Sequence, residues 1–199
     1  MSVPLDQFRE NIGRVKNLVS LYKALRLNVT PAVDLSDVLR SALVLAVSAA
    51  DHYVHEIVRI GMLEAFVGKR PSTAAFLNFQ VSTSSVKEAL SLPLATDWLD
   101  SEIRRRHGYR SFQHSSHVAE ALRLISDVSL WDEIAKTLAG SPSLTKEQMN
   151  LIVDRRNKIA HEADMDPGSP GSRWPIDDAL VEESITFLED VALAIDDLI

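Results

Sequence analysis

Residues 41–62 read SALVLAVSAADHYVHEIVRIGM and lie within the longest and most apolar segment of the sequence, which spans about residues 36–67. Between Ala42 and Ala50, apolar side chains occupy nearly every side of a helix, whereas a surface helix carries them on one stripe only. A helix of this kind is buried all round. The sequence therefore predicts that this segment forms the centre of a helical bundle.

Amphipathic and short helices are predicted around this central helix. Pro4 to Leu27 carries apolar residues at helical spacing with Arg and Lys on the other side, and a last helix is expected from about Pro175 to Ile199. Several short helices are expected between about residues 72 and 138. With only 7 glycines and 8 prolines, the chain is predicted to be an all-α bundle with one long central helix and several short helices.

Length and composition indicate one domain over residues 1–199, and an insertion of short helices at about residues 70–142 is left open. Hydrophobic residues make up 46% of the chain and charged residues 25%, which is ordinary for a globular protein. The absence of cysteine excludes disulfides and thiolate metal sites.

Neither a signal peptide nor a membrane-spanning segment is expected. Asp6, Arg9 and Glu10 stand where a signal peptide needs an apolar core, and Asp51 ends the apolar run of residues 42–50. We therefore expect a cytoplasmic protein without a membrane partner.

Basic residues are clustered although the net charge is −7, a value that argues against unspecific coating of nucleic acid. The first cluster lies at the end of a predicted helix, where cations complement the helix dipole; we favour this interpretation over a track for an RNA backbone. The second cluster belongs to the helix discussed next. The two clusters consist of Arg104, Arg105, Arg106 and Arg110, and of Arg155, Arg156 and Lys158.

The segment RRNKIAHE, residues 155–162, is the strongest candidate for a functional site. Its helix is predicted to begin at Thr145, where Thr145 and Gln148 have the spacing of a capping box. Asn157 and His161 are four residues apart and share one face, whereas Arg156 falls on the apolar stripe.

A guanidinium on the apolar stripe is costly to bury unless it is paired. Arg156 is therefore expected to meet a carboxylate inside the fold, to line a cleft, or to face a second subunit. Asp51 or Glu56 of the central helix, with His55 one turn from Asp51, is a candidate to pair with and position it. The alternative, that these side chains form ordinary pairs at a solvated helix end, is left open, and a metal site built on them is the weakest interpretation.

The chemistry of Arg156, Asn157 and His161 suits the handling of a phosphate group. Arginine is a fixed cation with a fork of donors, histidine titrates near neutrality, and asparagine offers a neutral amide that orients its neighbours. None of these functions requires a metal, a thiol or a cofactor.

The pattern Arg156-Asn157-x-x-x-His161 resembles the motif of the HEPN superfamily, helical proteins many of which are metal-independent ribonucleases. Three further segments extend the resemblance to the RiboL-PSP-HEPN subfamily over most of the chain: residues 41–62, residues 159–177 (IAHEADMDPGSPGSRWPID), and the final helix.

This resemblance implies an endoribonuclease that works as a homodimer, in which the motifs of two subunits form one composite site. Its catalytic residues would be Arg156, Asn157 and His161. It further implies a toxin or phage-defence effector restrained by an antitoxin or another regulatory protein. Arg155 would support the motif, and Lys158 would contact RNA. The alternative is a non-catalytic helical module that binds RNA, a nucleotide or a protein partner.

Overall fold

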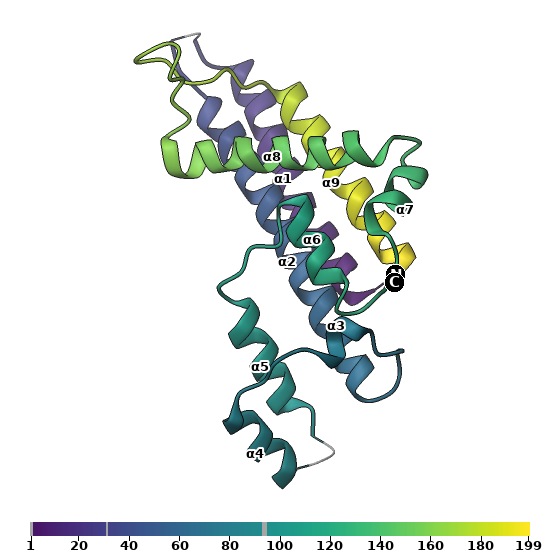
Figure 1. Ribbon diagram of the computed structural model, residues 1–199. Helices are drawn as coiled ribbons and strands as arrows, with labels where there is room; N and C mark the ends of the chain where they lie inside the picture. The colour runs from purple at the N-terminus through teal and green to yellow at the C-terminus, as the bar shows by residue number, and fades with distance from the viewer. Residues whose placement is uncertain (1, 31, 93–94) are drawn as a thin grey trace.

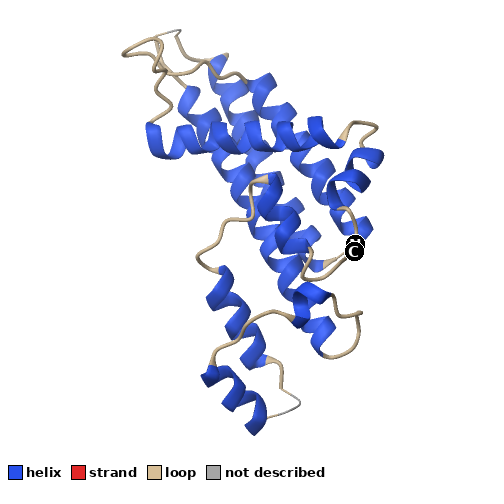
Figure 2. Cartoon of the chain, viewed as in Figure 1, coloured by secondary structure: helices blue, strands red, loops and turns tan. Residues whose placement is uncertain are grey.

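The computed structural model describes residues 2–30, 32–92 and 95–199 as helices joined by loops (Figure 1, Figure 2). In these residues the only strand-like pairing is an isolated bridge between Met165 and Arg173, and the all-α prediction is confirmed. The helices in chain order are α1 (Val3–Arg26), α2 (Ser36–Phe66), α3 (Ala74–Leu77), α4 (Thr83–Ser91), α5 (Asp97–His107), α6 (Ser115–Leu122), α7 (Leu130–Thr137), α8 (Pro142–Glu162) and α9 (Asp178–Leu198).

Helix α2 is the centre of the fold, as its composition predicts. It packs against α1 and α9 along its length and also contacts α5, α6 and α8. Leu39, Leu43, Ala46 and Val47 are all 0% exposed. Full burial of one such leucine or valine contributes about 1.5–3 kcal/mol to folding, so this helix organises the core.

Helices α1, α2 and α9 lie side by side, and α8, which is as long as α9, packs on α2 at a steep angle near one end of the bundle (Figure 1). The start of α1 lies beside the C-terminal end of α9, where the amide of Ser2 donates a hydrogen bond to the carboxylate of Asp196 at 3.2 Å. The phenyl ring of Phe8 on α1 packs against Tyr53 of α2, with ring centroids 5.6 Å apart.

Helix α8 begins three residues earlier than the sequence predicts. Its N-cap is Ser141, whose side chain accepts a hydrogen bond from the amide of Leu144, and Pro142 occupies the first turn. The capping box expected at Thr145 is therefore wrong, because serine followed by proline is the stronger start signal. Thr145 lies inside the helix, and its hydroxyl donates to the carbonyl of Ser141.

The segment between α2 and α8 forms the predicted short helices. Helices α4 and α5 pack on each other and extend away from the end of the bundle that α8 crosses (Figure 1), while α6 and α7 return to pack on α8. The division of the chain into one domain with an insertion at about residues 70–142 stays a prediction. No helix in the described residues combines the length and apolar character that crossing a membrane requires.

Candidate functional site

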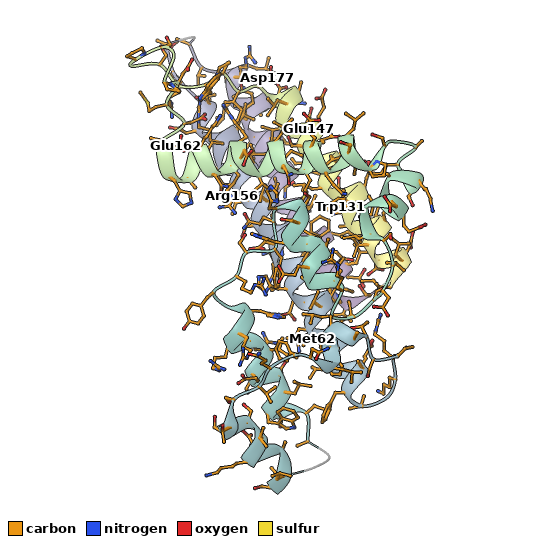
Figure 3. All side chains as sticks on the ribbon, viewed as in Figure 1. Met62, Trp131, Glu147, Arg156, Glu162 and Asp177 are labelled. Carbon is orange, nitrogen blue, oxygen red and sulfur yellow. The ribbon has the colours of Figure 1, made fainter. Side chains whose placement is uncertain are left out.

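The C-terminal half of α8 carries the Arg-Asn-x-x-x-His motif on a helix whose inner face is held by the core. Ile152 and Val153 are 7% and 4% exposed and face the bundle. Arg156 and Asn157 are half-buried, and His161 is exposed in the last turn before Glu162. Figure 3 shows Arg156 on α8 ahead of Glu162 at the helix end. The helix that carries the motif is therefore anchored by Ile152 and Val153 in the core, whereas His161 is open to solvent.

Arg156 makes no ion pair or hydrogen bond within the described part of the chain. The two carboxylates predicted to position it have other partners. Asp51 accepts hydrogen bonds from the Phe112 amide at 2.6 Å and from the Gln113 side chain at 3.0 Å. The structure therefore leaves open the other two outcomes for a half-buried guanidinium, a cleft contact or a second subunit.

Glu56, the other candidate partner, forms an ion pair with Arg59 at 2.7 Å and lies 3.5 Å from Arg104. Burial raises the pKa of its carboxyl, but the bonds from Arg59 and the charge of Arg104 outweigh burial and lower the pKa overall. His55 packs its ring on Phe112, with centroids 4.4 Å apart. These residues belong to a network between α2, α5 and the segment after α5.

Arg155, the neighbour of Arg156, forms an ion pair inside the fold, which was one of the three outcomes expected for Arg156. Its guanidinium donates to the carboxylate of Asp164 at 2.8 Å and to the carbonyls of Trp174 and Pro175, each at 3.1 Å. Burial lowers the pKa of Arg155, an effect that Asp164 opposes and Arg40 reinforces.

Arg40 completes a buried cluster of two cations and one anion. Its guanidinium donates to Asp164 at 2.6 Å and to the carbonyl of Trp174 at 2.8 Å. The side chain of Asp164 is 0% exposed and that of Arg40 only 7%. Sequence reasoning missed both residues, although an arginine beside Leu39 on the most apolar helix carries the same signal that drew attention to Arg156.

The loop after α8 is fixed by this cluster. Ala163 and Asp164 adopt left-handed backbone angles, with φ of 51° and 58°, and the Asp164 amide donates to the Lys158 carbonyl at 2.9 Å. Such a C-cap ends the helix at Glu162, one residue after His161. The ammonium of Lys158 lies 5.0 Å from the ring centre of Trp174, and Arg173 forms an ion pair with Asp34 of the loop before α2 at 2.9 Å.

The basic residues of α5, for which RNA contact was the less favoured of two interpretations, are paired with carboxylates. Arg105 and Arg106 bond the buried Glu102 at 2.6 and 2.9 Å, and the bond from Arg105 is the main reason why the pKa of Glu102 is held well below its usual range. Arg104 bonds Asp100 at 3.0 Å. Arg110, after α5, pairs with Glu120 at 2.7 Å. Lys158 is a predicted contact that forms no ion pair in the described residues.

No group of three or more histidine, aspartate and glutamate side chains in the described residues is arranged to hold a metal ion.

An all-α bundle with a long central helix, and an Arg-Asn-x-x-x-His segment at the end of a crossing helix, define a protein of the HEPN class. The family model described as RiboL-PSP-HEPN matches residues 9–199, and the chain belongs to this family. The resemblance seen in the sequence is thereby confirmed. No curated protein and no solved structure matches the chain.

Proposed function

We propose that the protein is a metal-independent endoribonuclease that cleaves RNA at a composite site formed by two copies of the chain. Membership of the HEPN family and the Arg156, Asn157 and His161 side chains support this proposal. A role as a toxin or phage-defence effector, a cytoplasmic location and restraint by an antitoxin or regulatory protein are parts of the same proposal.

The observation that carries it is the state of Arg156. Arg156 is half-buried on α8 and has no carboxylate partner in the described residues. Its positive charge is available to an anion that comes from outside the protomer. A phosphodiester group is such an anion, and the donor fork of arginine matches its oxygens.

Helix geometry supports a site shared between two protomers. Arg156 and His161 are five positions apart in the sequence, which places them about 140° apart around the helix axis and roughly 7.5 Å apart along it. Side chains that diverge in this way are poorly placed to hold one phosphate together. In a symmetric dimer, Arg156 of one protomer and His161 of its partner would meet at the same phosphate.

The proposed reaction follows from the chemistry of these groups. His161 takes the proton from a ribose 2′-hydroxyl, and the 2′-oxygen attacks the adjacent phosphorus as the bond to the 5′-oxygen breaks. The leaving oxygen takes a proton from water. Arg156 stabilises the charge on the pentacovalent phosphate, and Asn157 orients the phosphate or the imidazole. The products are a 2′,3′-cyclic phosphate and a 5′-hydroxyl end.

The second candidate is a non-catalytic helical module that binds RNA, a nucleotide or a protein partner. The pairing of Arg104, Arg105, Arg106 and Arg110 with carboxylates favours it, because it leaves few free cations for a long RNA backbone. The net charge of −7 also favours the non-catalytic module, because it disfavours extended contact with an RNA backbone.

The experiment that tests the proposal is cleavage of a mixed RNA pool by the purified dimer in EDTA, with His161→Ala as the control. We expect cleavage by the wild type alone, with cyclic phosphate ends. Absence of cleavage at concentrations where the dimer is shown to form would favour the non-catalytic module.

A further inference from the structure

A groove separates the N-terminal half of α8 from α9, at a distance along α8 from the motif. Helix α8 packs on α2 and α7, whereas α9 packs on α1, α2 and α7, so the two helices diverge. The space between them has a volume of about 580 Å³ and is lined by residues of the α7–α8 turn, of α8 and of α9. It is open to solvent and independent of the proposed ribonuclease site.

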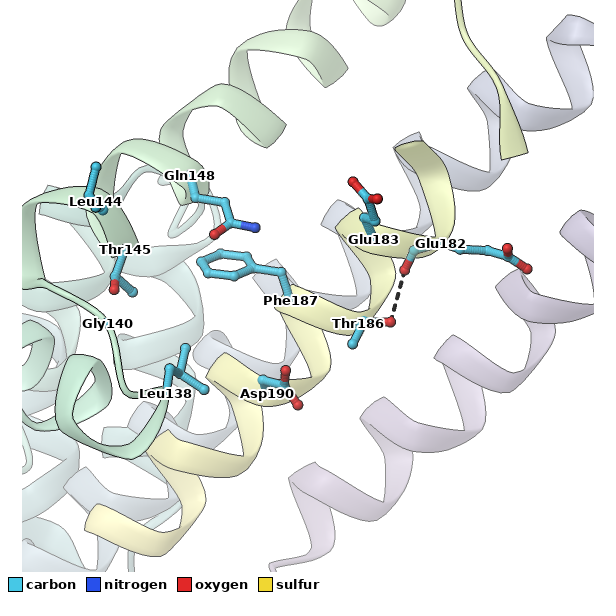
Figure 4. A pocket seen from close by; sticks show the side chains of 10 residues that line it. All are labelled: Leu138, Gly140, Leu144, Thr145, Gln148, Glu182, Glu183, Thr186, Phe187 and Asp190. Carbon is cyan, nitrogen blue, oxygen red and sulfur yellow. Dashed lines mark hydrogen bonds between the residues drawn. The ribbon is translucent and has the colours of Figure 1, made fainter. Parts of the chain in front are cut away.

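The floor and one wall of the groove are apolar. Phe187 projects from α9 toward α8, opposite Gln148, and forms the floor (Figure 4). Leu144 on the α8 wall is 65% exposed, and Leu151, two turns further along the same face, is 61% exposed. Leu144 therefore adds exposed apolar surface to the groove, and Leu151 extends this apolar surface along α8 beyond the groove.

The rim of the groove on α9 is acidic. Glu183 and Asp190 stand on either side of Phe187, four residues before it and three residues after it (Figure 4). Neither carboxylate forms an ion pair or hydrogen bond in the described residues, and no lysine or arginine lines the groove. Glu182, also at the rim, is already paired with Lys23 of α1 at 2.7 Å.

We propose that this groove binds a basic amphipathic helix of a partner protein. Two helical walls with an apolar floor fit the helix-in-groove mode, in which the bound helix inserts its apolar face. Glu183 and Asp190 are seven residues, or about 10 Å, apart along α9. The bound helix therefore carries an apolar residue between two basic residues that are two turns apart, and this spacing makes the inference specific.

The test is selection from a phage-displayed library of random peptides of about 16 residues, long enough for four helical turns. The library is panned on the wild-type protein and depleted on the Leu144→Asp/Glu183→Lys/Asp190→Lys variant. We expect enriched peptides with a net positive charge, with lysine or arginine at positions i and i+7 and an apolar residue at i+3 or i+4. Their affinity should fall at least tenfold on the groove variant.

A matched control is the Leu90→Asp/Glu88→Lys/Asp97→Lys variant on α4 and α5, which changes one exposed leucine and two exposed carboxylates far from the groove and alters the net charge by the same amount. Circular dichroism checks that both variants are folded, as expected for exposed positions. Enrichment of acidic or unpatterned peptides, equal binding to the groove variant, or no enrichment would overturn the inference. Loss of the dimer in the groove variant, measured by sedimentation, would do so as well, since it would show that a second copy fills the groove.

Discussion

The carboxylate of Asp164 lies 2.8 Å from the guanidinium of Arg155, so the helix that carries the motif is ion-paired to the loop that follows it. Arg40 of α2 bonds the same carboxylate oxygen at 2.6 Å. One buried anion thus joins α2, the end of α8 and the 163–175 loop. This joint determines where α8 ends and how His161 is presented.

Replacement of Asp164 by alanine should lower the free energy of unfolding by about 3–5 kcal/mol, because the buried Arg40 and the half-buried Arg155 lose their common partner. Urea unfolding followed by circular dichroism measures the change. The matched control is Asp154→Ala, an exposed carboxylate on α8, which should change stability by less than about 0.5 kcal/mol. Equal effects of the two substitutions would show that the cluster contributes little to folding.

Arg156→Ala should leave stability within about 1 kcal/mol of the wild type, because Arg156 has no ion-pair partner in the described residues. RNA cleavage should fall by roughly 10²–10³-fold, the usual cost of losing one donor to the transition state. Thermal unfolding and single-turnover cleavage measure the two effects, with Arg123→Ala as an exposed arginine control. A loss of 3–5 kcal/mol would instead assign Arg156 a structural ion pair.

The sequence sufficed for the position of α2 and for the motif, because continuous apolar character and helical spacing are local properties. It did not suffice to decide which of two adjacent arginines is buried in an ion pair. Arg155 and Arg156 differ by about 100° around α8, and the carboxylate that selects Arg155 comes from Asp164, beyond the helix end. Ala163 and Asp164 both adopt left-handed backbone angles, and although aspartate is enriched in this region, alanine is not, so the sequence gives no signal for a turn that starts at Ala163.

A dimer of one Arg156→Ala protomer and one His161→Ala protomer tests whether the site is shared. If Arg156 and His161 act across the interface, one of the two sites in this mixed dimer is intact, and it should retain about half of the wild-type activity. The mixed dimer is prepared by co-expression with two affinity tags, and each homodimeric variant serves as the inactive control. An inactive mixed dimer would place both residues in the same protomer.

Salt dependence of RNA binding should separate Lys158 of α8, which forms no ion pair in the described residues, from the paired cations of α5. In a His161→Ala background, Lys158→Gln should lower the slope of log Kd against log salt by about 1, since one phosphate contact is lost. Arg104→Gln should leave the slope nearly unchanged, because Asp100 already binds its guanidinium at 3.0 Å. The reverse order of effects would indicate that RNA follows α5.

His107 should make folding stability depend on pH between about 6.5 and 4. Burial lowers the pKa of its imidazole to about 4, with His55 and Arg110 contributing, while the unfolded chain keeps the ordinary value near 6.5. In this range the unfolded state binds a proton that the folded state does not. The free energy of unfolding therefore falls as the pH is lowered from about 6.5 toward 4, and the loss is complete below the folded pKa.

His107→Leu should remove this part of the pH dependence, because leucine has no proton to bind and fills the same apolar site against Phe112. His117→Leu, at an exposed position, is the control and should retain the wild-type slope. Urea unfolding at several pH values between 4 and 7 compares the three proteins. Parallel pH profiles for the wild type and His107→Leu would show that the folded protein protonates His107 as readily as the unfolded chain does. That outcome would contradict the burial of His107, whose Nδ1 atom has no partner in the described residues.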